Sequence, residues 1–157
     1  MVCIRPAKTT DILEMQHCNL YNLPENYNLR YWLYHAMSWP QLPQVAVDEH
    51  TGKVVGYVLA KMDDDDEKKD SKSHGHITSI SVLREYRKLG IATKLMRAAQ
   101  HAMKTIYNAG YCSLHVRMSN RAAITLYRDV LGYEILRVED EYYADKEHAY
   151  DMKLFFC

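Results

Sequence analysis

Hydrophobic and polar positions along the chain follow two different periods. Residues 53–62 (KVVGYVLAKM) are almost continuously apolar, which is typical of a strand buried on both faces. Residues 91–106 instead place an apolar residue at every third or fourth position, which indicates an amphipathic helix. Its apolar stripe consists of Ile91, Leu95, Ala99, Ala102 and Ile106.

The same criteria divide the rest of the chain into short helices and strands. Thr9 or Thr10 is expected to cap a helix that is broken at Pro24, and Asn120 caps a helix that runs to Leu131 and ends at Gly132. The other predicted elements are a strand at 2–6, a helix at 29–39, and strands at 44–49, 74–86, 111–116, 133–143 and 149–156. Helices interleaved with strands in this order predict an α/β or α+β protein with a mixed sheet.

The predicted strand at 74–86 does not alternate regularly. Ile80 and Val82 share one face of the strand, whereas Ile77 is out of phase with them. Either both faces of this strand are buried, or a β-bulge lies near Thr78 and Ser79.

Composition and charge restrict the class of protein. The 157 residues fit one domain, and 20 basic against 20 acidic residues argue against a strongly basic nucleic-acid binder, although a local basic patch stays open. The four cysteines form no CxxC pair, which disfavours zinc and thioredoxin-type chemistry and favours free thiols in a reducing compartment. No apolar targeting segment begins the chain, and no apolar run reaches the roughly 18 residues of a membrane span. We therefore expect a cytoplasmic or nuclear protein.

Residues 63–73 (DDDDEKKDSKS) are rich in charge and contain no apolar side chain. This composition predicts a solvated loop, because the segment has nothing to bury. An acidic patch that binds a partner is the alternative interpretation.

The turn RKLGIA, residues 87–92, is the first candidate binding site. A helix N-terminus presents unpaired backbone N–H groups and a partial positive charge, and phosphate groups bind there. Gly90 allows the backbone to approach a ligand closely, while Arg87 and Lys88 add formal charge. One compact turn suits a diphosphate better than a nucleic acid. An ordinary helix start remains the alternative, whereas neither a dinucleotide-binding GxGxxG nor a P-loop sequence is present.

A second motif follows the next predicted strand. In residues 120–133 (NRAAITLYRDVLGY), Asn120, Tyr127 and the ending at Gly132 stand at set intervals after the glycine turn. Together the two motifs resemble the GNAT superfamily of acetyl-CoA-dependent N-acetyltransferases. The resemblance implies a single GNAT domain over residues 1–157, with a mixed, mostly antiparallel sheet of about seven strands and helices on both faces.

This resemblance also implies acetyl-CoA as co-substrate and no metal. In the superfamily the R/Q-x-x-G-x-G/A turn binds the CoA pyrophosphate, and Ala92 occupies its last small position here. The strand before the turn pairs with the pantetheine arm, a following Asn contacts the cofactor, and a Tyr lies near its sulfur. The implied cofactor-binding residues are Ile80, Ser81, Val82, Arg87, Lys88, Leu89, Gly90, Ile91, Ala92, Asn120 and Tyr127.

Six further blocks narrow the resemblance to the catalytic subunits of NatA-type N-terminal acetyltransferases. They run in the same order between Ile4 and about Met152: MQHCNLYNLPENY, YHAMSWPQL, VVGYVLAKM, HGHITS, SLHVRMSNRAA and YYADKEHAYDM. Such enzymes acetylate protein α-amino groups. The resemblance implies a large helical-repeat auxiliary subunit, and through it the ribosome, as partners, with no membrane and no directly bound nucleic acid. It further implies Ser, Ala, Gly or Thr N-termini as substrates of the complex, and acidic N-termini as substrates of the free chain.

Residues 11–39 are the expected docking surface for such a subunit. Tyr31, Trp32, Trp39 and Leu42 are candidate anchors, because large aromatic and apolar side chains dominate protein interfaces. The alternative is that they pack in the core, which we prefer for Trp39.

The chemistry of the nucleophile favours α-amines over lysines. An α-amino group with a pKa near ~7.7–8.0 is partly neutral at cellular pH, so a modest base is enough, whereas a lysine near ~10.4 requires more. Glu25, in a loop directly after Pro24, is the candidate base. The residues alone favour an exposed loop carboxylate at this position, and the resemblance instead places Glu25 at the substrate amine.

The resemblance assigns further roles around this glutamate. Tyr127 would hold or protonate the leaving CoA thiolate, and Tyr143 or its neighbour Tyr142 would hydrogen-bond the peptide. His115 and Arg117 alternate on one strand and therefore share a face, although a structural role for His115 is equally open. The implied catalytic residues are Glu25, Tyr127 and Tyr143, and the implied substrate-binding residues are Leu23, Pro24, Glu25, Tyr27, His115, Arg117, Tyr142 and Tyr143.

Two details depart from a simple assignment. His74 and His76 could suggest a metal, but two histidines do not complete a zinc site and a structural role is favoured. Lys146 stands where the related pattern YADGEDAY has glycine, which puts substrate preference at this turn in doubt.

The competing functions are a lysine or small-amine acetyltransferase on the same fold and a non-catalytic CoA-binding subunit. The RKLGIA turn with Glu25 argues against the second of these.

Overall fold

A seven-stranded mixed sheet forms the centre of the protein. The computed structural model describes residues 1–63 and 73–156, and the predicted loop at 63–73 lies almost entirely outside them. The strand order is β1-β2-β3-β4-β5-β7-β6, and every neighbouring pair is antiparallel except β4 with β5. The strands are β1 (Val2–Pro6), β2 (Gln44–Asp48), β3 (Val54–Asp63), β4 (His74–Val82), β5 (Tyr111–Arg117), β6 (Glu134–Glu139) and β7 (Ala149–Phe155). The predicted element order and the expected mostly antiparallel sheet are both confirmed.

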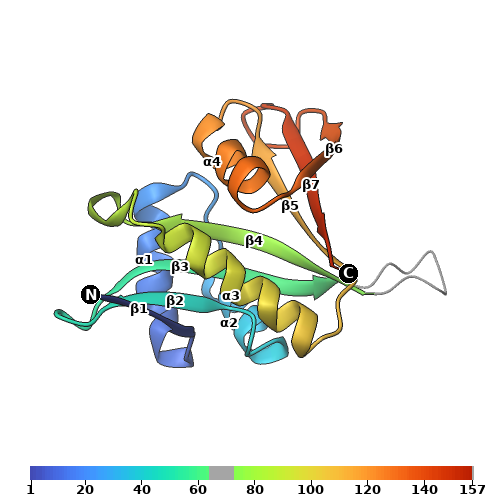
Figure 1. Ribbon diagram of the computed structural model, residues 1–157. Coiled ribbons are helices and arrows are strands. Elements are labelled where there is room, and N and C mark those ends of the chain that lie inside the picture. The colour runs from blue at the N-terminus through green and yellow to red at the C-terminus, as the bar shows by residue number, and fades with distance from the viewer. Residues whose placement is uncertain (64–72, 157) are drawn as a thin grey trace.

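Helices cover both faces of the sheet (Figure 1). Helices α1 (Ile12–Asn22) and α2 (Leu29–Ser38) pack on one face around Trp32 and Tyr57. Helix α3 (Ile91–Thr105) packs on the other face, together with α4 (Arg121–Thr125) and the π-helical turn Leu126–Val130 that continues it. Strand β3 is buried along nearly its whole length between these layers, as its continuous apolar run predicted. No helix within residues 1–63 and 73–156 has the length and apolar character to span a membrane.

Strands β4 and β5 pair only at their beginnings and then separate (Figure 1). Their last aligned residues are Ile77 and Leu114, although β4 continues to Val82 and β5 to Arg117. In the β3–β4 pair, Leu59 lies opposite Ser79 and Ala60 opposite Ile77, which leaves Thr78 as an extra residue. The predicted bulge is therefore confirmed, and it explains why Ile77 is out of phase with Ile80. The bulge also lies where β4 leaves β5, and bulges commonly end strand pairing near active sites.

The ends of the helices partly follow the predictions. Asn120 caps α4 by accepting a hydrogen bond from the backbone N–H of Ala123 (3.2 Å), and Gly132 has the positive φ of 83° expected after a helix. The threonine cap of α1 is wrong: residues 9–11 form a 3₁₀ turn. There the Asp11 carboxylate accepts from the backbone N–H of Lys8 and pairs with Arg5.

Two boundaries of the predicted elements differ from the structure. Ile106, expected in the buried stripe of α3, is 54% exposed because the helix ends one residue earlier. The strand predicted over 74–86 ends at Val82 and is followed by a 3₁₀ turn at Arg84–Tyr86.

Candidate active site

The RKLGIA turn lies at the start of α3, beside α4. Gly90 is the N-terminal boundary residue of the helix, with φ of 78°, and a Cβ atom built on it would meet no atom within 4 Å. The first helical hydrogen bond runs from the Lys94 N–H to the Gly90 carbonyl (3.1 Å), so the N–H groups of residues 91–93 have no helical acceptor. Open space in front of unpaired N–H groups is the geometry that binds an anion.

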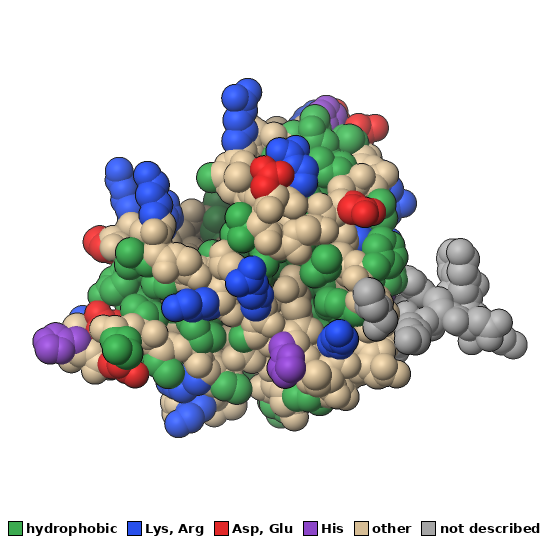
Figure 2. All heavy atoms as spheres, in the orientation of Figure 1, with side chains coloured by type: hydrophobic (Ala, Val, Ile, Leu, Met, Phe, Trp, Pro, Cys, Tyr) green, Lys and Arg blue, Asp and Glu red, His purple; other side chains and the backbone are tan. Residues whose placement is uncertain are grey.

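A hollow of about 300 Å³ opens in front of this turn. It is lined by Val82, Tyr86, Arg87, Lys88, Gly90, Ile91, Ala92, Thr93, Ala122 and Leu126. Figure 2 shows Lys and Arg side chains projecting at this end of the molecule, on the left of the view. Arg87 is held in place because its guanidinium donates to the Val82 carbonyl (3.0 Å) and to Oδ1 of Asn22 (3.0 Å). Arg87 is therefore built into one wall of the hollow, and Lys88 also lines it.

A second cavity, of about 200 Å³, lies where β4 and β5 separate. It is bounded by the loop between α1 and α2, the loop between β6 and β7, and the start of α4. Asn120, Ala123 and Tyr127, from α4, its N-cap and the π-helical turn that continues it, face this cavity, while Ala122 and Leu126 face the first hollow. The lining residues are Leu23, Glu25, Tyr27, His76, Ile77, Thr78, Ser79, Ile80, Leu114, His115, Val116, Arg117, Asn120, Ala123, Tyr127, Tyr142 and Tyr143. The two spaces thus adjoin along one helix.

Arg117 joins three carboxylates at the mouth of the second cavity. Its guanidinium donates to Glu25 through Nε (3.2 Å) and Nη2, to Asp145 (2.8 and 3.0 Å), and to Glu147 (2.8 Å). Burial lowers the pKa of Arg117, but the hydrogen bonds that it donates to Glu147, Glu25 and Asp145 outweigh burial and raise the pKa. The guanidinium carbon also lies 4.1 Å from the ring centre of Tyr143. Arg117 therefore ties the Glu25 loop to the β6–β7 loop across the cavity.

Glu147 is itself held by Ser119. Its carboxylate accepts from the Ser119 backbone N–H (3.0 Å) and hydroxyl, and the pKa of Glu147 is lowered first by Ser119 and then by Arg117. The pKa of Asp145 is lowered by the backbone N–H of Glu147 and by Arg117. Both carboxylates are thus stabilised as anions, and Arg117 is fixed from two sides.

Four tyrosines surround the cavity with protonated hydroxyls. Burial raises the pKa of Tyr127 and of Tyr27 to about 12 each. Burial also raises the pKa of Tyr143 and of Tyr142, with Glu25 adding to the effect at Tyr143. Tyr127 is 7% exposed and its hydroxyl has no hydrogen-bond partner among the residues that the structure describes, so this O–H can donate into the cavity.

His115 lies on the same face of β5 as Arg117, as the alternation predicted. Its ring stacks on Tyr142, with ring centres 4.4 Å apart, and lies 5.5 Å from the ring of His76. Burial lowers the pKa of His115, although the charge of Asp151 opposes this effect. Burial, reinforced by His115, lowers the pKa of His76 to about 4. Both imidazoles are therefore neutral in the folded protein at cellular pH.

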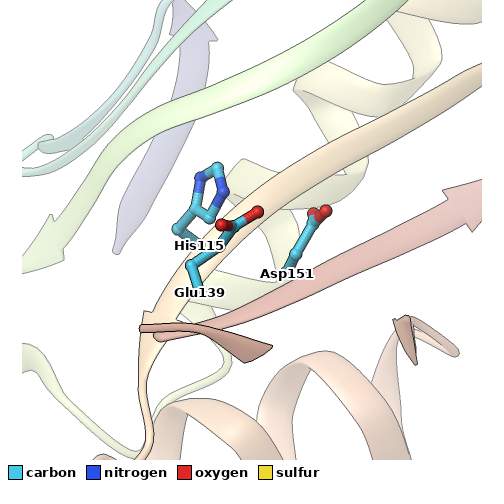
Figure 3. Close-up of side chains that lie close together, drawn as sticks. All are labelled: His115, Glu139 and Asp151. Carbon is cyan, nitrogen blue, oxygen red and sulfur yellow. The ribbon is translucent and has the colours of Figure 1, made fainter. Parts of the chain in front are cut away.

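Figure 3 shows His115, Glu139 and Asp151 side by side on β5, β6 and β7. One potential ligand atom from each lies within 4.8 Å of the others. Arg137 already pairs with both carboxylates, through Nε to Glu139 (2.7 Å) and to Asp151 (3.2 Å). A guanidinium that pairs with both carboxylates accounts for their proximity without a metal ion.

The structure brings most of the predicted site residues together, with three exceptions. Ser81 lines neither space, because the residues after the bulge turn its side chain toward α1, where it hydrogen-bonds Cys18. Leu89 is 63% exposed and does not line the turn's hollow, and Pro24 does not line the cavity. Only their backbones remain available for the predicted contacts.

The predicted docking anchors are partly wrong. Trp32 and Leu42 are fully buried and belong to the core, and Trp39 is half-buried against it, as we preferred for that residue. The exposed apolar side chains of α1 and α2 are instead Leu13, Leu20, Tyr21, Leu29, Tyr34 and Met37.

Sequence reasoning missed the carboxylates that hold Arg117 and the β4 residues that line the cavity, apart from Ile80. Asp145 and Glu147 gave no signal beyond ordinary loop acids. His76 was weighed as a metal ligand against a structural role, which was favoured, and Thr78 was considered only as a bulge position. The out-of-phase Ile77 was the one pattern that pointed toward this part of the site.

The chain belongs to the acetyltransferase (GNAT) family, whose model matches residues 9–133. Within that family it is an acetyl-CoA-dependent N-terminal α-amino acetyltransferase, as its relatives indicate. It is 61% identical over 153 residues to the N-terminal acetyltransferase A complex catalytic subunit NAA10 of Arabidopsis thaliana, covering 98% of this chain and 77% of the relative. It is 60% identical over 149 residues to the corresponding subunit ard1 of Schizosaccharomyces pombe, covering 95% and 82%.

A solved structure agrees with these relatives. The chain resembles Naa20 of Chaetomium thermophilum in complex with a bisubstrate analogue, at a TM-score of 0.86 and 32% identity over 98% of this chain and 86% of that one. The predicted GNAT fold, enzyme class and acetyl-CoA co-substrate are therefore confirmed. The residues present also fit acetyl-CoA, because the open space at Gly90 and the unpaired N–H groups after it suit a diphosphate.

Proposed function

We propose that α-amine acetylation takes place in the cavity between β4 and β5, with Glu25 as base and Tyr127 as acid. The observation that carries the proposal is the adjacency of the two spaces along α4: an anion site at Gly90 leads to a cavity that contains both residues. Acetyl-CoA supplies the acetyl group as a thioester. Glu25, directly or through a water molecule, removes a proton from the α-ammonium group, and the neutral amine forms the amide bond as the C–S bond breaks.

Tyr127 is the candidate donor to the leaving sulfur. Its raised pKa keeps the hydroxyl protonated, and the departing thiolate takes this proton. The nitrogen loses its second proton to solvent as the neutral amide forms, and Tyr127 is reprotonated from solvent, so this proton balances the one given to the sulfur. The proton taken by Glu25 is released. Arg117 holds Glu25 toward the cavity, and Tyr143 lies over Arg117 where a peptide backbone would pass.

We further propose the substrates and partners of the chain. In complex with a large helical-repeat auxiliary subunit, and at the ribosome through it, the chain acetylates N-termini that begin with Ser, Ala, Gly or Thr. The free chain prefers acidic first residues. The NAA10 and ard1 relatives are named as catalytic subunits of complexes, which supports an auxiliary partner. The exposed apolar residues of α1 and α2, which flank the Glu25 loop, are the proposed docking surface. The proposed location is the cytoplasm, and also the nucleus.

A peptide panel tests the substrate assignment. The purified chain is assayed with acetyl-CoA against peptides that differ only in the first residue, in the presence and absence of the auxiliary subunit. A peptide with a blocked α-amine and a free lysine is the matched control. We expect acetylation of free α-amines only, with a change of preferred first residue when the subunit is added. Acetylation of the blocked peptide at a comparable rate, or an unchanged preference, would contradict the proposal.

A further inference from the structure

His35 of α2 makes a hydrogen bond that reaches across to β4. The residue is fully buried, and its Nδ1 lies 2.9 Å from the backbone carbonyl of Tyr31. A carbonyl can only accept, so Nδ1 carries the hydrogen and Nε2 is the acceptor. The Thr78 hydroxyl, 2.8 Å from Nε2, therefore donates to His35. Burial lowers the pKa of His35, which agrees with a neutral ring in this tautomer.

Thr78 is the bulged residue of β4. It lies one residue past Ile77, the last position at which β4 aligns with β5, and it lines the cavity that contains Glu25. From this point on, the β4 backbone groups on the β5 side have no partner strand. The orientation of the bulge therefore determines where those groups point within the cavity.

Thr78 receives a second contact from the same direction. The hydroxyl of Tyr27 lies 3.5 Å from the Thr78 carbonyl, and Trp32 donates through Nε1 to the Tyr27 carbonyl (3.3 Å). The segment from Tyr27 to His35 is thus attached to one residue of β4. The His35 bond is the shorter of the two contacts to Thr78.

We propose that His35 is a positioning residue that fixes the β4 bulge through the Thr78 hydroxyl and so couples helix α2 to the reaction cavity. This inference rests on the proposed function, because it takes that cavity as the place of acetyl transfer. The inference adds that the position of α2 affects turnover through the His35–Thr78 bond, independently of Glu25. A displacement of α2 changes the orientation of the bulge through this bond, and a misplacement of about 1 Å in a reacting geometry can reduce a rate by up to about 100-fold.

The test is a double-mutant cycle on the full chain. Thr78→Val removes the hydroxyl and keeps the branched shape, and His35→Phe removes both ring nitrogens and keeps the ring. Each single variant should lower kcat about tenfold, and the double variant should lower it no further, because both changes break the same bond. Thr78→Ser, which retains the hydroxyl, should restore most of the wild-type kcat.

A control separates positioning from loss of stability. Gln44→Leu removes another buried side-chain hydrogen bond, from Gln44 Nε2 to the Gln41 carbonyl (2.8 Å), at the start of β2. This variant should lower Tm as Thr78→Val does and leave kcat unchanged. If His35→Phe does not fold, the Val and Ser variants of Thr78 still carry the test.

A wild-type kcat in folded Thr78→Val protein, or equal losses in the Val and Ser variants, would overturn the positioning role. Additive losses of the two single changes would also reject it, since they would show independent effects. The proposed function fails in a different way, through a wild-type kcat in Glu25→Gln protein while Thr78→Val still lowers turnover. The two failures are therefore distinguishable.

Discussion

Replacing Glu25 by Gln tests the assignment of the base with little change of shape. In the wild-type protein Glu25 accepts two hydrogen bonds from Arg117, at Nε and Nη2, both on the same oxygen Oε1. A glutamine amide keeps an oxygen that can accept both bonds, so the loop should stay in position. What the substitution removes is the ability to take a proton. Acetyl-CoA binding should hold, because the turn at Gly90 lies in the other hollow.

The magnitude follows from the role of a base and from the substrate amine. Loss of a general base typically lowers turnover by about 10²–10⁴-fold. With an amine pKa near ~8, about a tenth of the substrate is neutral at pH 7 and about nine tenths at pH 9. The ratio of wild-type to mutant kcat should therefore fall as pH rises, because the neutral amine no longer needs the carboxylate.

The assay is a pH series of kcat and KM on both proteins, with Tm measured at each pH. Asp145→Asn is the matched control, since Asp145 binds the same guanidinium but does not line the cavity. We expect this control to change kcat by less than a few-fold. A stable Glu25→Gln enzyme with a wild-type kcat across the series would refute the base. A raised KM with unchanged kcat would instead assign Glu25 to substrate binding alone.

Three further changes test other parts of the structure. Gly90→Glu should abolish acetyl-CoA binding in a thermal-shift titration, whereas Gly52→Glu, at a similar φ of 72° with equally open space, should cost the same stability and spare binding. Burial lowers the pKa of His76 to about 4 in the folded protein, whereas the pKa of an unfolded histidine is near ~6.5. Between these two values the unfolded chain binds more protons than the folded one, so the free energy of unfolding falls as pH falls. His76 should account for a loss of about 2 kcal/mol in the free energy of unfolding between pH 7 and pH 5, measured by denaturant titration. His76→Phe should remove this part of the pH dependence. Lys146→Gly should raise stability by about 0.5–1 kcal/mol, because Lys146 has φ of 66°, and an unchanged denaturation midpoint would contradict the strain.

Much of the fold could be predicted because local patterns report burial. An apolar period of two residues, or of three to four, tells which face of a strand or helix meets the core, and these periods predicted the element order. The continuous apolar run predicted the buried strand β3. The out-of-phase Ile77 left two alternatives, two buried faces or a bulge near Thr78 and Ser79, and the structure shows the bulge at Thr78. The same logic misled us at Trp32 and Leu42, whose size suggested interface anchors although both are core residues. A large apolar side chain at helical spacing indicates burial, and does not tell whether the core or a partner covers it.

The cavity could be predicted only in part, because its contacts join distant segments. Glu25 and Arg117 are 92 positions apart in the sequence, and nothing local to either indicates the other. Asp145 and Glu147 look like ordinary loop acids until the β6–β7 loop reaches β5. The family resemblance supplied Glu25 and Arg117 from known enzymes, while the ion pairs that position them required the tertiary structure.

The one parallel pair in the sheet explains why both halves of the site lie together. A parallel connection from β4 to β5 needs a crossover, and α3 provides it, so the helix must begin at the carboxyl end of β4. That end is where β4 has left β5 and no strand fills the gap. The unpaired N–H groups of the helix start therefore face the same side as the opening in the sheet, and ligands of open α/β sheets bind at such carboxyl ends. The bulge at Thr78 begins this separation, which makes the residue that fixes it, His35, part of the geometry of the reaction cavity.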